Sequence, residues 1–161
     1  MKRKTILLGL NELNFDYIKF YINQGLLPNF KRIFDIQPPI ETVSEKDYKL
    51  LEPWVQWVTI HTGMSFDEHK VFRLGDIVNH GEFSQLFEEI ENEGFSVGAV
   101  SPFNADNRLR NPAFFVPDPW TKTKPSGNWI VKALYQAVHQ SVNDNAKSKL
   151  KFNSMISLAL G

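Results

Sequence analysis

The 161-residue chain contains no cysteine. This absence excludes thiol catalysis, cysteine-ligated zinc and a disulfide framework. The chain also lacks an excess of either charge, because 18 lysine and arginine residues balance 18 aspartate and glutamate residues. Bulk positive charge is the usual footprint of a nucleic-acid-binding surface. We therefore expect no nucleic-acid partner.

Long apolar runs are missing as well. No stretch approaches the roughly 20 apolar residues that a membrane-spanning helix needs, so we expect no membrane association. The basic start, residues 2–4, precedes an apolar run at 5–10 that resembles the start of a signal peptide. This run is too short for such a peptide, and Asn11 and Glu12 interrupt it. The sequence thus predicts a cytoplasmic protein.

The patterns that are present favour an α/β fold. Apolar runs at 5–10 and 95–100 are nearly continuous, which is typical of strands that are covered on both faces in a parallel sheet. Shorter strands are expected at 40–43 and 113–116. The length fits one domain, so we expect a single domain over 1–161.

Helical spacing of apolar residues alternates with these strands. It predicts helices that begin near Phe15, Pro28, Pro53, Phe83, Trp129 and Phe152. The order of helix, glycine and short apolar strand between Phe83 and Val100 is the rhythm of a βαβ unit. Residues 101–127 are rich in proline and asparagine and predict a long loop or lid.

Asn11 and Glu12 are the first candidates for chemistry, because they follow the first predicted strand. Ligands of open α/β sheets bind outside the carboxyl ends of the strands. A carboxylate and an amide oxygen at this position suit a hard or borderline cation. The alternative is a capping turn, in which Asn11 and Asn14 bond nearby backbone amides and Glu12 is simply exposed.

Glu52 is the second candidate, because it stands immediately before the helix that begins at Pro53. The N-terminus of a helix offers free backbone N–H groups and a favourable field for a phosphate or sulfate. In the alternative interpretation, Glu52 only interacts with the dipole of its own helix.

The remaining polar candidates are weaker. The histidines at 61, 69, 80 and 139 are too widely spaced to favour a histidine-only metal site. The loop residues Asn104, Asp106, Asn107 and Arg108 either line a pocket or serve as ordinary turn residues.

Four segments in order resemble the alkaline phosphatase superfamily, in particular its phosphodiesterase and nucleotide-pyrophosphatase-like, sulfatase-related branch. The family's first strand ends in a metal-binding aspartate and is followed by a helix and a Gly-x-Leu-Pro-Asn segment; the matching residues are 6–12 and 25–30 (GLLPNF). A proline- and tryptophan-containing helix ending in Thr-Gly, with a histidine beyond it, matches residues 53–63 and His69. Residues 93–98 look like the family's return from helix to strand, so the resemblance covers about residues 4–100.

The resemblance implies a three-layer α/β/α sandwich with a mainly parallel sheet and an incomplete C-terminal half. It also implies hydrolysis of a small-molecule phosphate or sulfate ester that depends on one or two metal ions, with zinc or manganese as the candidates. By position, Asn11 and Glu12 would bind the metal, and Glu52 would take the catalytic place near the reacting group.

Two positions depart from the family pattern. Asn11 replaces the metal-binding aspartate, and the place of the nucleophile falls on Glu52 or Pro53, neither of which has a hydroxyl. Ser44 and Thr59 are nearby hydroxyls in another register. Because residues 158–161 stop inside an apolar helical pattern, we expect the other ligands to come from a missing C-terminal half or from another protein.

Three hypotheses follow from these observations. The chain is a piece of an ester hydrolase with a degenerate or incomplete site, or a non-catalytic binding or assembly protein that retains the fold, or an unrelated α/β domain.

Overall fold

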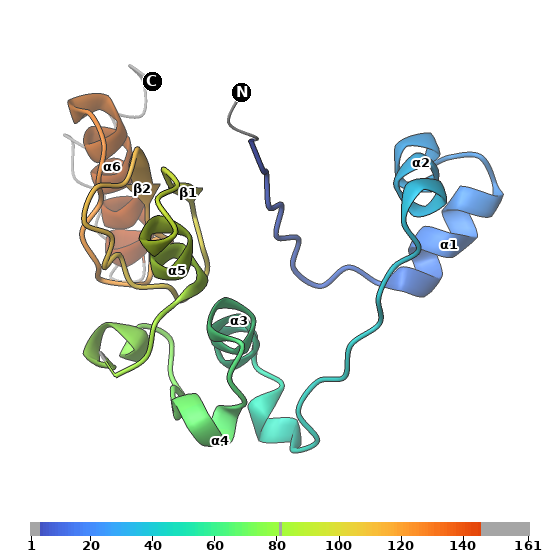
Figure 1. The fold of residues 1–161 in the computed structure, drawn as a ribbon, viewed down its shortest axis with the longest axis horizontal. Helices are drawn as coiled ribbons and strands as arrows, with labels where there is room; N and C mark the ends of the chain where they lie inside the picture. The colour runs from blue at the N-terminus through green and yellow to red at the C-terminus, as the bar shows by residue number, and fades with distance from the viewer. Residues whose placement is uncertain (1–3, 81, 146–161) are drawn as a thin grey trace. The chain divides into compact units, whose positions relative to one another are not determined.

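The computed structural model describes residues 4–80 and 82–145 (Figure 1). Contacts divide the chain into two compact units, Met1–Ser44 and Glu45–Gly161. The described residues form a mixed, helix-rich structure with one small parallel sheet of two strands. The helix predicted near Phe152 lies outside the described residues.

The first unit contains two helices, α1 (Phe15–Asn23) and α2 (Pro28–Ile36). The Asn14 side chain caps α1, since its Oδ1 accepts hydrogen bonds from the amides of Asp16 (2.9 Å) and Tyr17 (3.1 Å). Proline at the first position of α2 is compatible with a helix start, because that position has no intrahelical N–H bond to lose. Both predicted helices are therefore confirmed.

The two strands predicted in this unit are absent. Residues 5–10 and 40–43 form no strand, and the side chains of Ile6 (91% exposed) and Val43 (98%) face solvent. A strand needs a neighbouring strand for its backbone hydrogen bonds, and residues 4–44 of the first unit offer none. Ile18 is the one buried apolar side chain among those residues.

The second unit contains the other regular elements that the structure describes. Its helices are α3 (Pro53–Thr62), α4 (Phe66–His69), α5 (Leu86–Asn92) and α6 (Trp129–Asn145), with 3₁₀ turns η1 (Tyr48–Leu50) and η2 (Asp76–Asn79). Its strands are β1 (Gly98–Val100) and β2 (Phe114–Val116). No helix among the described residues is long and apolar enough to cross a membrane.

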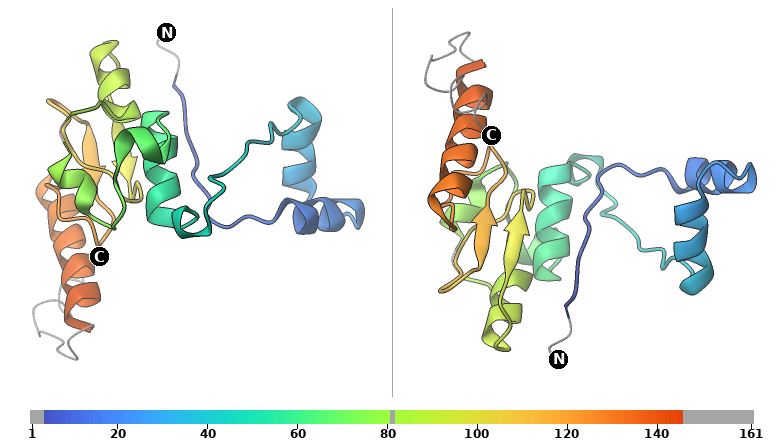
Figure 2. Two further views of the ribbon diagram at one scale, coloured as in Figure 1. Left: turned by 90° about the horizontal axis from the view of Figure 1, so that it is seen from below. Right: turned by 90° about the horizontal axis from the view of Figure 1, so that it is seen from above.

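Strands β1 and β2 run parallel, with Gly98 opposite Phe114 and Ala99 opposite Phe115 (Figure 2). On the other side of β2, Phe115 and Ser126 exchange two backbone hydrogen bonds of 2.7 and 2.8 Å. In the described part of the chain, β1 has β2 as its one strand neighbour. Both strands end at the same edge, which we call the carboxyl edge, marked by Ser101 after β1 and Pro117 after β2.

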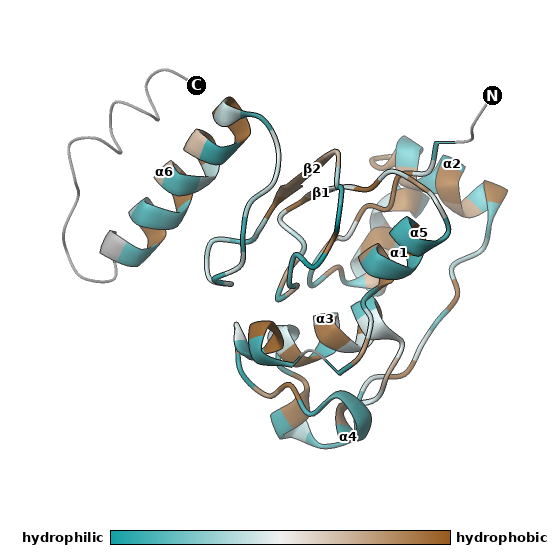
Figure 3. Cartoon of the chain, turned by 60° about the vertical axis from the view of Figure 1, so that its left-hand side comes forward, coloured by the Kyte–Doolittle hydropathy of each residue, from teal (hydrophilic) through white to brown (hydrophobic). Residues whose placement is uncertain are grey.

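Two apolar clusters hold the second unit together. One joins α3 to the following segments through Val58, Val71 and Ile77. The other covers one face of the sheet, where the ring of Phe87 in α5 meets the ring of Phe115 edge to face at 5.9 Å. Figure 3 shows the largely apolar strands and the hydrophilic outer surface of α5. The expected α/β pairing of helix and parallel strand is thus present on a small scale, with two strands.

Candidate functional site at the carboxyl edge of the sheet

Glu52 occupies the N-cap of α3. Its backbone carbonyl accepts hydrogen bonds from the amides of Val55 (2.9 Å) and Gln56 (3.1 Å). Its side chain is exposed and makes no capping bond to the helix. The carboxylate therefore stands free at the positive end of the helix dipole.

Asn104 attaches this end of α3 to the carboxyl edge. The residue follows β1 by four positions and is fully buried. Its Nδ2 donates to the carbonyl of Trp54 in the first turn of α3 (2.7 Å), and its Oδ1 accepts from the amide of Gly75 (2.8 Å). The N-terminus of α3 consequently lies beside the end of β1, which is where open α/β sheets bind ligands.

Asp118 closes the same edge from the side of β2. Its buried carboxylate accepts hydrogen bonds from the amides of Asn104 (2.9 Å), Trp120 (2.8 Å) and Thr121 (2.8 Å), and from the Thr121 hydroxyl (2.6 Å). These four donors satisfy the carboxylate within the fold. Asp118 was not among the residues predicted from the sequence, although its place two positions after a predicted strand was an available signal.

The side chains of Asp106, Asn107 and Arg108, which the sequence suggested as pocket-lining, form hydrogen bonds and an ion pair with other groups of the protein. The Arg108 guanidinium donates to the carbonyls of Phe83 (2.8 Å), Ile77 (3.0 Å) and His80, and it pairs with Asp106 at 2.9 Å. Asn107 donates to the carbonyl of Lys124 at 2.6 Å. The interpretation as structural loop residues therefore describes most of their polar atoms; the buried Oδ1 of Asn107 is the one among them without a hydrogen-bond partner.

Thr59 and His69 resemble a hydroxyl–imidazole dyad, with 3.2 Å between Oγ1 and Nε2. The amide of Val71 donates to Nδ1 of His69 at 3.0 Å, so the proton of the neutral ring must sit on Nε2. Nε2 then donates to the threonine and cannot accept its proton, as a general base must. Burial lowers the pKa of His69, which favours this neutral ring. The pair is a structural link between α3 and α4.

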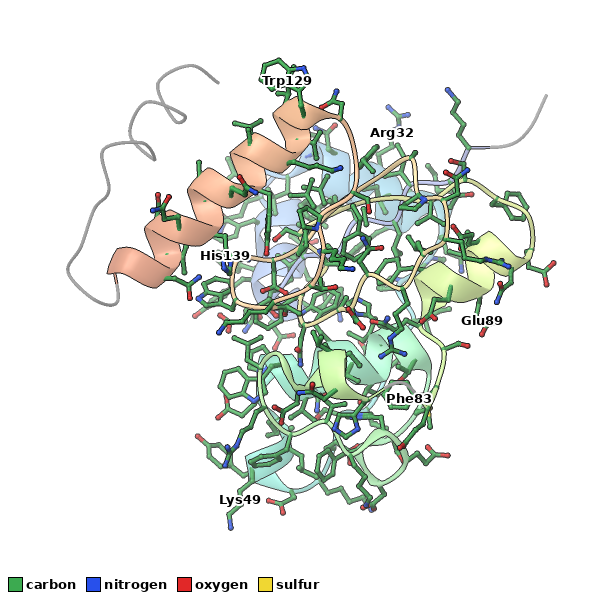
Figure 4. The ribbon with its side chains drawn as sticks, turned by 90° about the vertical axis from the view of Figure 1, so that its left-hand side faces the viewer. Arg32, Lys49, Phe83, Glu89, Trp129 and His139 are labelled. Atoms are coloured by element: carbon green, nitrogen blue, oxygen red, sulfur yellow. The ribbon has the colours of Figure 1, made fainter. Side chains whose placement is uncertain are left out.

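His61 stands at the other end of α3 from Glu52. Its ring lies between those of Trp57 (5.6 Å) and Phe87 (5.1 Å), and burial lowers its pKa to about 4. The ring borders an open hollow of about 550 Å³ that Phe83 and Glu89 also line. Figure 4 labels Phe83 and Glu89. The Nδ1 atom of His61 has no hydrogen-bond partner and is enclosed by protein, so a ligand in the hollow would not reach that atom.

Asn11 and Glu12 lie in the first unit, in an exposed turn between Leu10 and α1. Glu12 has a left-handed backbone with φ of 56°, a conformation that costs a non-glycine residue about 1 kcal/mol. The Asn14 side chain caps α1, as the alternative interpretation of a capping turn expected for that residue. The structure places Asn11 and Glu12 side by side in the chain, and Glu52 belongs to the second unit.

These residues do not by themselves fit a metal ion. Across residues 4–80 and 82–145, no three His, Cys, Asp or Glu side chains gather into a group that could hold one. Asn11 and Glu12 offer one amide oxygen and one carboxylate, whereas zinc is usually held by at least three protein ligands. We therefore derive no reaction step through a metal.

Comparisons with known proteins identified no relative of this chain. No family model, no curated protein and no solved structure matches the chain.

Proposed function

We propose that the chain is part of an alkaline-phosphatase-like protein related to metal-dependent phosphate- and sulfate-ester hydrolases, with a degenerate or incomplete site at the carboxyl edge. The supporting observation is the 2.7 Å hydrogen bond from Asn104 to the carbonyl of Trp54. It sets the N-terminus of a ten-residue helix beside the end of a parallel strand. Helix N-termini in this position bind phosphate groups in many α/β proteins.

The fold we propose is the three-layer α/β/α sandwich with a mainly parallel sheet and an incomplete C-terminal half. A parallel sheet is buried on both faces, and a pair of short strands is marginal alone.

In this proposal Asn11 and Glu12 contribute oxygen ligands to zinc or manganese, and Glu52 contacts the reacting phosphoryl or sulfuryl group. Other groups must complete the metal shell, because two side chains are too few. The small-molecule ester is recognised chiefly through its anionic group.

Hydrolysis of bis(p-nitrophenyl) phosphate and p-nitrophenyl sulfate by the purified chain tests this proposal. Because part of the metal shell is missing, we expect only a slow rate, which rises with added Mn²⁺ or Zn²⁺ and falls at least about tenfold in Glu12→Ala and in Glu52→Gln, the loss expected when a group that stabilises the transition state is removed. Glu82→Gln, which removes a carboxylate from another exposed position, should keep the rate. A rate that is indifferent to metal and to both variants would refute the proposal.

A second candidate is a non-catalytic protein that keeps the fold for binding or assembly. It is favoured by the missing hydroxyl at residues 52 and 53, and by the proton arrangement of Thr59 and His69. This candidate predicts that calorimetry detects phosphate or vanadate binding while no ester is cleaved at any metal concentration. Turnover that depends on Glu12 would eliminate it.

A further inference from the structure

We propose that Asn104 is a positioning residue, which fixes the N-terminus of α3, and with it Glu52, at the carboxyl edge. Its importance for chemistry rests on the proposed function, which assigns Glu52 to the site. The positioning itself does not depend on that assignment, because it follows from contacts within the second unit.

The hydrogen bonds of Asn104 reach three separate segments. The side chain bonds Trp54 in α3 and Gly75 before η2, and the backbone amide bonds Asp118 after β2. Every polar atom of the side chain thus has a partner, while the residue is 0% exposed. Removing the side chain would leave the carbonyl of Trp54 and the amide of Gly75 without these partners.

The backbone of Asn104 is held in a costly conformation. Its φ is 48°, in the left-handed region that asparagine tolerates better than most residues. Ser101, at the start of the same loop, has φ of 52°. Strained backbone persists where the surroundings enforce it, and such residues concentrate at functional sites. Asp118 contacts this backbone directly, by accepting the hydrogen bond of the Asn104 amide at 2.9 Å.

Amide hydrogen exchange measured by NMR on the full chain tests the proposal without any substrate. The amides of Val55 and Gln56 bond the carbonyl of Glu52, so their protection reports how firmly Glu52 is held. The amide of Gly63, which bonds Thr59 at 2.8 Å, reports the opposite end of α3. We expect Asn104→Gly, which adds no backbone strain, to reduce protection at Val55 and Gln56 about tenfold more than at Gly63, the factor expected for one net hydrogen bond.

The matched control is Asn107→Gly, which removes another well-bonded asparagine from the same loop. We expect it to reduce protection at both ends of α3 equally. Asn104→Asp is the second variant: it keeps the acceptor for Gly75, sets a carboxylate oxygen against the carbonyl of Trp54 in place of the N–H donor, and buries a charge, and it should reproduce the selective loss at the N-terminus of α3. Equal losses at both ends in either Asn104 variant would overturn the positioning role. The hydrogen-exchange measurement contains no ester and no metal, so a failure of the positioning role can be told apart from a failure of the proposed hydrolase function.

Discussion

His61 couples the stability of the second unit to pH. Its ring is 6% exposed and wedged between two aromatic rings, and burial lowers its pKa from 6.5 to about 4. Between pH 4 and pH 6.5, His61 is therefore protonated in the unfolded chain and neutral in the folded chain. The free energy of unfolding must therefore be greater above pH 6.5 and must fall as the pH drops toward 4.

We predict that this residue accounts for up to about 3 kcal/mol of the loss between pH 7 and pH 4. His61→Phe should keep the ring contacts and remove that share, so its unfolding free energy should depend less on pH. Urea denaturation of both proteins at several pH values measures the difference. Parallel pH profiles would show that His61 is not buried as a neutral ring.

A substitution at Gly98 tests how β1 pairs with β2. A Cβ atom at this position would lie 2.5 Å from Cζ of the Phe114 ring, its cross-strand neighbour. We predict that Gly98→Ala lowers the free energy of unfolding by about 1–3 kcal/mol, the usual cost of overpacking. Thermal or urea denaturation gives the value.

A double-mutant cycle identifies the cause of this loss. In the background of Phe114→Ala, the cost of Gly98→Ala should largely disappear, because the colliding ring is gone. Gly63→Ala serves as the comparison: its φ is 70° and no atom lies within 4 Å of the added Cβ. That variant should cost about 1 kcal/mol from backbone strain in either background. An unchanged cost for Gly98→Ala would refute the predicted register.

The elements predicted correctly from the sequence are helices whose ends are set by neighbouring residues. Asn14 before α1 and Gly63 after α3 act through bonds within a few residues, and such signals are legible in one sequence. The strands at 5–10 and 40–43 were wrong for the structure described, because pairing depends on a distant partner that local pattern does not specify. The four-residue helix α4 is held by the contacts of His69 and Glu68 rather than by apolar periodicity.

The residues of the candidate site likewise differ in whether their roles have local or distant causes. The N-cap position of Glu52 was predictable from the proline that follows it. The hydrogen bonds of Asn104 and Asp118 join residues that are 50 and 14 positions apart, and no spacing rule reveals them. The metal role of Asn11 and Glu12 stays a prediction that comes from the resemblance.

At the scale of the whole molecule, the first unit is too small to be stable by itself. Its two helices have nine residues each, below the roughly 12–15 that isolated helices need. Ile18 is the one buried apolar side chain among residues 4–44. We predict that a peptide of residues 1–44 shows little helix in far-UV circular dichroism. A peptide with the full signal of α1 and α2 would show that the unit folds without further burial.

The proposed function assigns Asn11 and Glu12 to a metal ion and Glu52 to the reacting group, and so requires these three residues to share one site. A crystal structure of the chain grown with Mn²⁺ tests it through the distance between the carboxylates of Glu12 and Glu52. We expect the Glu12 carboxylate to bind a Mn²⁺ ion and the Glu52 carboxylate to face the same ion across one cleft. Carboxylates that face different surfaces would contradict the shared site, and only the small α/β structure of the second unit would remain.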